Sequence, residues 1–256
     1  MWFARKQHGM TLLVVLMIVF VMTLMGAIAI RQGAFALDIA GQGQVNPLML
    51  HNADTAILQL EHMPQLAQQW SVDGVFNAIR PADNHTKELV LCYRGHQAEP
   101  LNIAHASLMQ WSSGEAAPNG TAWGTQGYCS SQSGRRDFSS GRHAVMTQIS
   151  IRLLPVTEAD QPFSGDVAGT DFTMAQLTLP ENMEVHAVSL MPALSTAMGQ
   201  QIDDCLSTKM TVPIVPLEMQ ASSEAKQSVT ECLAAFNIPF VVTSSVLRLR
   251  QTIAEI

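Results

Sequence analysis

The chain opens with one long apolar stretch and then changes to shorter, periodic patterns. No charged residue occurs from Met10 to Ile30, a run of 21 residues. A helix of this length measures about 31 Å, close to the thickness of the hydrocarbon core of a bilayer. The basic residues before the run are Arg5, Lys6 and His8. Since basic flanks stay in the cytoplasm, the pattern predicts a single-pass helix with the rest of the chain on the other side.

The helix is expected to continue past Arg31 in amphipathic form. Pro47 is expected to interrupt or kink it, because proline lacks the backbone donor that a helix interior needs. Helical spacing returns from 48 to 62. The apolar residues that fall near one face of this stretch are Leu48, Ala53, Ala56, Ile57 and Leu60. A short helical extension is expected at 63–70.

Strand patterns follow. Glu88 to Tyr93 is short and rich in β-forming residues, and the residues from Val145 to Leu153 alternate between apolar and mostly polar. Phe172 to Leu179 and Met183 to Leu190 are separated by three residues, which is consistent with a hairpin. Further extended segments are expected at 240–242 and 246–250, and short helices at 190–205 and 224–236. This order predicts an α+β fold, one long helix against an antiparallel sheet with decorated loops.

Residues 112–143 have a different composition, in which Ser, Gly, Pro and Asn dominate. The segment is interpreted as a long exposed loop that Cys129 anchors. Arg135, Arg136 and Arg142 lie in it, where they could contact DNA phosphates. The formal net charge of −7 argues against broad nucleic-acid binding, so pairing of these arginines with acidic neighbours or with water is favoured.

The four cysteines form no C-x-x-C motif and lack histidines at the spacing of a zinc site. Beyond the apolar helix they face a compartment in which disulfides persist. Of the three possible pairings, Cys92–Cys129 with Cys205–Cys232 closes the shortest loops and is the one expected. No G-x-S-x-G or H-E-x-x-H motif occurs. We therefore expect no metal, no cofactor and no enzymatic activity.

The residues at the start of the apolar run carry a specific order. A basic leader ends at Gly9, and Met10-Thr11-Leu12-Leu13 follows. This order resembles the prepilin signature of type IV pilins and type II secretion pseudopilins. The resemblance implies that a membrane-bound prepilin peptidase cuts after Gly9 and N-methylates Met10. The alternatives are an uncut signal anchor and an ordinary signal peptide, although the apolar core of the latter usually spans only about 7–15 residues.

One position departs from the common pilin pattern. Most major pilins carry Glu at the fifth mature residue, which is Val14 here. In the family this Glu attracts the charged N-terminus of the subunit above it. A subunit that starts a filament has none above it, and a buried carboxylate would only be costly. Val14 therefore points to an initiating or tip subunit, and both PilX-type minor pilins and K-type pseudopilins share this loss of Glu. The opening Thr11–Leu16 and the stretch from Met22 to Arg31 resemble the PilX-type group, and the similarity extends through Leu37–Gly41.

The resemblance implies a complete organisation. Residues 1–9 are the leader, 10–30 the transmembrane and filament-core helix, 31–70 its periplasmic continuation, and 71–256 a periplasmic, pilin-like globular domain. The disulfide loop of Cys205 and Cys232 resembles the C-terminal loop of many pilins. The implied function is assembly of a type IV pilus, or fimbrium, by priming the filament and capping its tip.

The implied partners are other minor pilins, a PilY-type tip adhesin that would connect the protein to cell adhesion, prepilin peptidase and the inner membrane. The implied location is the inner membrane before assembly and the pilus tip afterwards. Two alternatives remain open at this point: a K-type pseudopilin at the tip of a type II secretion pseudopilus, and a signal-anchored periplasmic binding or enzymatic domain.

Overall fold

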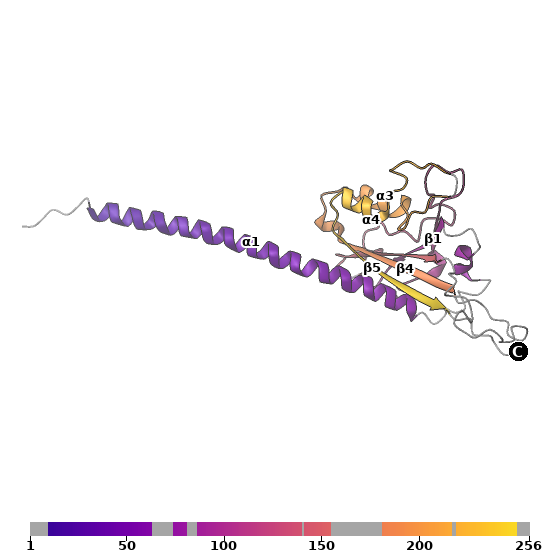
Figure 1. Ribbon diagram of the computed structural model, residues 1–256. Coiled ribbons are helices and arrows are strands. Elements are labelled where there is room, and N and C mark those ends of the chain that lie inside the picture. The colour runs from indigo at the N-terminus through magenta and orange to yellow at the C-terminus, as the bar shows by residue number, and fades with distance from the viewer. Residues whose placement is uncertain are drawn as a thin grey trace, which may run out of the picture. The chain divides into compact units, whose positions relative to one another are not determined.

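The computed structural model describes residues 10–62, 74–80, 86–139, 141–154, 181–216 and 219–249. The chain divides into two compact units, Met1–Pro47 and Leu48–Ile256. The boundary falls inside helix α1 (Met10–Glu61), the longest element in Figure 1. The unit from Leu48 onward contains the sheet and all the remaining elements.

Helix α1 runs without a break through Pro47, so the expected interruption at this residue is wrong. Proline removes one backbone hydrogen bond, the one to the carbonyl of Gly43. Gly43 has no atom of another part of the chain within 4 Å of the place where a Cβ would stand. The expected extension at 63–70 lies outside the described residues.

The globular unit is built on one five-stranded sheet in which every neighbouring pair is antiparallel. The strands are β1 (Lys87–Tyr93), β2 (Ser107–Gln110), β3 (Met146–Leu153), β4 (Glu181–Leu190) and β5 (Phe240–Leu249). Their order across the sheet is β2-β1-β3-β4-β5. The expected combination of an N-terminal apolar helix with an antiparallel sheet, an α+β fold, is confirmed.

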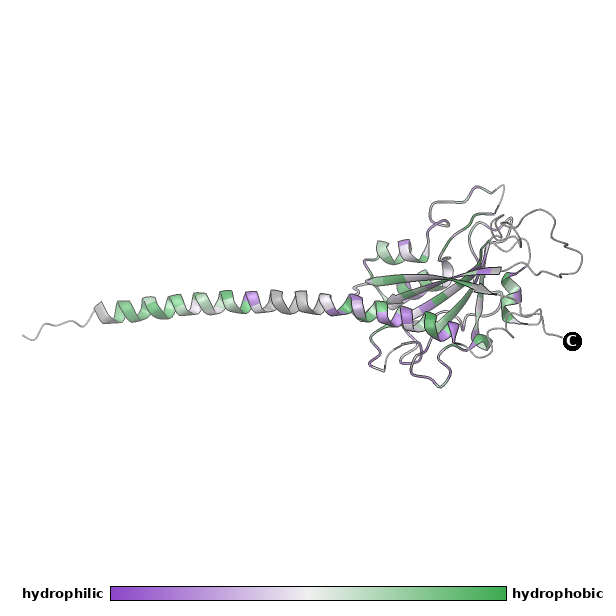
Figure 2. Cartoon of the chain, turned by 60° about the horizontal axis from the view of Figure 1, so that its bottom comes forward, coloured by the Kyte–Doolittle hydropathy of each residue, from purple (hydrophilic) through white to green (hydrophobic). Residues whose placement is uncertain are grey.

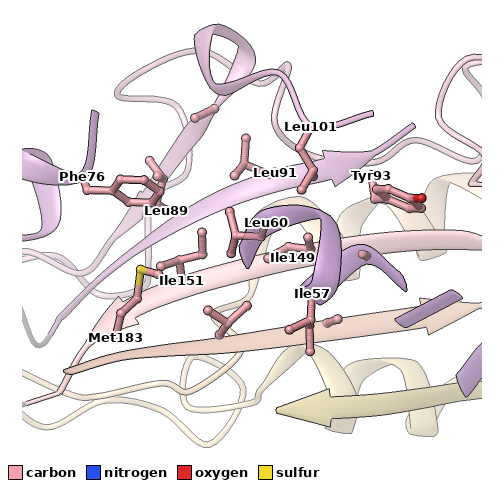
Figure 3. Packing of buried hydrophobic residues seen from close by; sticks show 14 of the residues in the cluster. Ile57, Leu60, Phe76, Leu89, Leu91, Tyr93, Leu101, Ile149, Ile151 and Met183 are labelled. Atoms are coloured by element: carbon pink, nitrogen blue, oxygen red, sulfur yellow. The ribbon is translucent and has the colours of Figure 1, made fainter. Parts of the chain in front are cut away.

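The end of α1 covers one face of this sheet. Ile57 and Leu60 project from α1 among side chains of β1 and β3 (Figure 3). The sheet residues of this cluster include Leu89, Leu91, Ile149, Ile151, Val185 and Ala187. The expected apolar face of 48–62 is correct except at Leu48, which is 41% exposed, while its neighbour Met49 is buried.

Two short helices, α3 (Gly199–Thr208) and α4 (Val229–Ala235), pack with the residues of the opposite face. Successive side chains of a strand point to opposite faces. In β1, Leu91 belongs to the hydrophobic cluster that also includes residues of α1. The next residue, Cys92, belongs to the hydrophobic cluster that includes residues of α3 and α4. The sheet is therefore the middle of three layers. Three short 3-10 helices complete the described elements, namely η1 (Val75–Ile79), η3 (Ile103–His105) and η5 (Pro192–Leu194).

Strand β3 is buried on both faces, which the alternating pattern did not predict. Its polar residues Gln148 and Ser150 are only 3% and 2% exposed. Gln148 remains satisfied because its Oε1 accepts a bond from the backbone N–H of Cys129 at 3.0 Å. Its Nε2 donates to the carbonyl of Leu206 at 2.9 Å. The polar side chains Gln148 and Ser150 of β3 are thus surrounded by protein rather than by water.

Other expected elements are found with changed limits. The extended segments 240–242 and 246–250 are parts of one strand, β5. The helix expected at 190–205 begins only at Gly199, because β4 runs to Leu190 and η5 follows it. The helix expected at 224–236 begins at Val229. There Ser228 Oγ accepts from the N–H of Glu231, and the Glu231 carboxylate accepts from the N–H of Ser228.

The hairpin expected between Phe172–Leu179 and Met183–Leu190 is not supported by the pairing of β4. From Met183 to Leu190 one edge of β4 pairs with β3 and the other with β5. No edge of this part of β4 is left for a third strand. The other half of the expected hairpin lies outside the described residues.

The packing of α1 on the sheet predicts the effect of truncating its side chains. Leu60→Ala should lower the free energy of unfolding by about 2–5 kcal/mol, because it leaves a cavity at a fully buried position. Leu58→Ala is the matched control, since Leu58 is 52% exposed, and should change it by less than about 0.5 kcal/mol. Urea unfolding of the full chain in detergent, followed by circular dichroism, measures both values. Equal losses in the two variants would contradict this packing.

Candidate functional site

The first candidate site is the apolar part of α1. Leu12–Gly33 is long and apolar enough to cross a membrane, with a mean hydropathy of 2.9 in its most apolar window. The large hydrophobic side chains from Leu12 to Ile30 are between 42% and 76% exposed. Figure 2 shows hydrophobic residues along this part of the helix. A surface of this kind is unfavourable in water, so it belongs in a bilayer, against other helices, or in a signal sequence.

Thr23 is the one polar side chain between Leu12 and Ile30, and it is satisfied within the helix. The hydroxyl of Thr23 donates to the carbonyl of Phe20 at 2.8 Å, so it adds no unpaired group to the apolar surface. Val14 is 49% exposed on the same surface and contributes no charge. Gly9 lies outside the described residues, and α1 begins at Met10. Cleavage after Gly9 and methylation of Met10 stay predictions.

The four cysteines form two disulfides. Cys92 of β1 is bonded to Cys129, and Cys205 of α3 is bonded to Cys232 of α4. These are the two nearest-neighbour pairs, and no cysteine is free. All four lie in the apolar cluster between the sheet and the two short helices. Paired cysteines of this kind are typical of an oxidising compartment.

The segment 112–143 has no helix or strand among its described residues, as expected, but it is not simply an exposed loop. Tyr128, Cys129 and Phe138 are at least 90% buried. At Gly127 a Cβ would collide with the backbone of Val90 and Ser107, so the loop lies directly against β1 and β2. Its burial comes from these long-range contacts, which its Ser- and Gly-rich composition did not indicate.

Asp137 is the charged centre of this loop. Its side chain is 1% exposed, and Oδ1 accepts from Nε of Arg94 at 2.8 Å. Oδ2 accepts from the backbone N–H of Ser130 at 3.2 Å. Arg94 also donates through Nη2 to the carbonyl of Gln126 at 2.9 Å. Both buried charges are therefore paired and hydrogen-bonded, the arrangement that makes burial of an ion pair tolerable.

A second carboxylate ties the loop to α3. Asp203 accepts a hydrogen bond from the hydroxyl of Ser130 and another from the backbone N–H of Ser131, each at 2.6 Å. The hydroxyl of Ser131 donates to the carbonyl of Gly199 at the start of α3. The loop, the sheet and α3 are thereby connected by one disulfide and several charge-assisted bonds.

The three arginines of the loop lie at the protein surface. Arg135, Arg136 and Arg142 are all exposed. Arg136 Nε lies 3.4 Å from Oδ1 of Asp137, which agrees with the expected pairing with an acidic neighbour. Within the described part of the chain, no group of three or more His, Cys, Asp or Glu side chains is placed to hold a metal ion.

Sequence reasoning missed Glu88, a buried carboxyl group in β1. Glu88 is 2% exposed, and its two oxygens accept from the backbone N–H groups of Thr211 and Val212, each at 2.8 Å. Burial raises the pKa of Glu88 to about 7, although the two backbone donors and Arg152 act in the opposite direction. The spacing in the sequence could have indicated this burial. Glu88 lies two residues before Val90 and four before Cys92, so its side chain is on the same face of β1 as these two buried residues.

Two neighbouring groups respond to this environment. Burial raises the pKa of the Tyr128 hydroxyl, and the charge of Glu88 adds to the rise. Burial also acts to raise the pKa of Glu184 in β4, but the hydrogen bond and charge of Arg152, with a smaller effect of His186, outweigh it and lower the pKa. Arg152 and Glu184 form an ion pair across β3 and β4.

Comparison with known proteins gives no match to a family model, to a curated protein or to a solved structure. The class that can be stated is an α+β protein with an exposed N-terminal apolar helix and two disulfides.

Glu88 predicts a pH dependence of stability. Its pKa is about 7 in the folded chain against 4.5 for an ordinary glutamate, so the folded state binds this proton more tightly. The contribution of Glu88 is therefore fully present below pH 4.5 and is lost as the pH rises to about 7. The loss should be about 3 kcal/mol by linkage.

The variant Glu88→Gln should remove this pH dependence, because the amide does not titrate in the window. Glu224→Gln, at an exposed glutamate, is the matched control and should keep the wild-type slope. Denaturant unfolding at several pH values across the window measures the slopes. If Glu88→Gln and the wild type had the same slope, the assignment of this pH dependence to Glu88 would be wrong.

Proposed function

We propose that this chain is a PilX-type minor pilin that helps to initiate a type IV pilus and remains at its tip. The observation that carries the proposal is the contrast along α1. Leu12–Gly33 is apolar with exposed side chains, whereas residues 49–60 of the same helix are buried on one face against the sheet.

An exposed apolar helix of this length needs a dry environment. A bilayer provides one, and a bundle of similar helices in a filament core provides another. A subunit that moves from the first to the second environment needs no other change in this segment. Thr23, the polar residue bonded to its own helix, is compatible with both.

The two disulfides support a location of the globular unit outside the cytoplasm. The basic residues before Gly9 would then stay on the cytoplasmic side, in agreement with the positive-inside rule. Together these features favour a single-pass inner-membrane precursor with a periplasmic domain. The prepilin-like order Gly9-Met10-Thr11 adds the expectation that the leader is removed.

Val14 supports an initiating subunit rather than a repeated one. A carboxylate at this position is useful only when a charged N-terminus lies beside it in a medium of low dielectric constant. A subunit with no neighbour above it would bear the cost of the charge without that attraction. Packing of α1 with other minor pilins then needs only apolar contact.

Processing of the leader is the first direct test. Prepilin peptidase should remove residues 1–9 and leave an N-methylated Met10. Gly9→Ala should sharply reduce cleavage, because the peptidase acts at this residue. Gly26→Ala is the matched control within the apolar run, since nothing lies within 4 Å of a Cβ at that position. Intact-mass analysis of the membrane-extracted protein measures the product, and a retained Met1 or a cut within the apolar run would contradict the proposal.

Position in the filament is the second test. Deletion of the protein should reduce the number of surface pili much more than their length, because initiation is lost. Val14→Glu should not improve assembly, since the added carboxylate has no partner and opposes burial of the helix. Labelled protein should be found at filament ends in low copy number. An even distribution along sheared pili would contradict a tip subunit, and a loss of type II secretion with normal pili would favour the pseudopilin.

A further inference from the structure

A polar pocket of about 320 Å³ lies in the globular unit. This volume is near the lower end of known ligand sites. Its walls come from the end of β1, from η3 and from the loop after Thr125. The side chains that matter for recognition are Arg94, His105, Gln126, Ser130, Arg136 and Asp137.

The floor of the pocket is a paired charge. The side chains of Arg94 and Asp137 are 8% and 1% exposed, and they are joined at 2.8 Å. Asp137 is held further by the N–H of Ser130, and Arg94 by the carbonyl of Gln126. The floor is therefore rigid, close to neutral, and already supplied with hydrogen bonds.

The rim carries a charge that this pair does not cancel. Arg136 is 67% exposed, and its Nε lies 3.4 Å from Asp137, longer than a good hydrogen bond. Because Arg94 already neutralises Asp137, the side chains that line the pocket have an excess of one positive charge. The carboxylate of Asp203 is not part of this lining and is already bonded to the hydroxyl of Ser130 and to the backbone N–H of Ser131. The exposed ring of His105, at the end of η3, adds a further hydrogen-bonding group to the lining.

The two walls are fixed relative to each other. The Cys92–Cys129 disulfide joins β1, two residues before Arg94, to the loop at a residue next to Ser130. The Arg94–Asp137 and Arg94–Gln126 bonds cross between the same walls. A site that is already formed loses little conformational entropy when a ligand enters it.

We propose that this pocket binds a single carboxylate from an acidic peptide segment of a partner protein, with Arg136 as the main contact. A guanidinium group matches the geometry of a carboxylate. The excess of one positive charge matches one negative charge. A phosphate dianion fits less well, because the single excess positive charge of the lining leaves its second negative charge unbalanced. The proposal does not depend on the pilin assignment.

Titration of the full chain in detergent micelles tests the proposal. The probe is glutamate blocked at both ends, which carries one carboxylate, and binding is followed by saturation-transfer NMR. We expect a dissociation constant in the millimolar range, no binding of blocked glutamine, and weaker binding of inorganic phosphate. Arg136→Gln should weaken binding about tenfold or more, because it removes a charge-assisted hydrogen bond.

Arg135→Gln is the matched control, because Arg135 is exposed one residue away and does not line the pocket. It should leave the affinity unchanged. Equal weakening by the two variants would reduce the effect to nonspecific attraction and overturn the proposal. Tighter binding of phosphate, equal binding of blocked glutamine, or no binding of blocked glutamate would also overturn it. The assay needs neither leader cleavage nor pili, so its outcome is separate from that of the proposed function.

Discussion

Burial of strand β3 on both faces is the constraint on which the rest of the globular unit depends. Ile149 and Ile151 lie under α1, whereas Met146 and Gln148 face the layer of α3 and α4. One helix can pack against only one face of the sheet, so a second layer is needed on the other face. The first layer, α1, precedes the sheet in sequence and the second is formed by segments that follow β1. This requirement explains why the unit has three layers around a sheet of only five strands.

The second layer is made of pieces that are too short to be stable alone. Helices α3 and α4 have 10 and 7 residues, below the length at which isolated helices persist in water. The Cys205–Cys232 disulfide joins them, and Cys92–Cys129 joins the neighbouring loop to β1. The buried pair of Arg94 and Asp137 acts across the same junction. Covalent and charge-assisted links thus hold the segments of this layer in place, and the polar pocket is a consequence of where they meet.

Local pattern predicted the elements whose surroundings are uniform. The apolar run of α1 and the helical spacing of Ala53, Ala56 and Leu60 were sufficient, because within each of these two stretches successive turns repeat one environment. Pattern failed where burial comes from distant residues. Strand β2 has only 4 residues and no clear alternation, and Asp137 is buried by a partner 43 positions away. Glu88 was missed for the same reason, since the donors that satisfy it are more than 120 positions away. The spacing of the cysteines was enough to predict the two disulfides. It did not indicate that both disulfides lie in one apolar cluster.

Glycines along α1 leave space that no described residue of the chain fills. Gly26 and Gly33 have nothing within 4 Å of the place where a Cβ would stand, and the same is true of Gly43. Glycine in a helix interior costs about 1 kcal/mol relative to alanine, and nothing described in this chain uses the space that it leaves. A close approach by another helix would use that space, because small residues let helix backbones come together in a dry environment. These glycines therefore leave α1 open to the close approach of another helix, a contact that the larger apolar side chains around them would hinder.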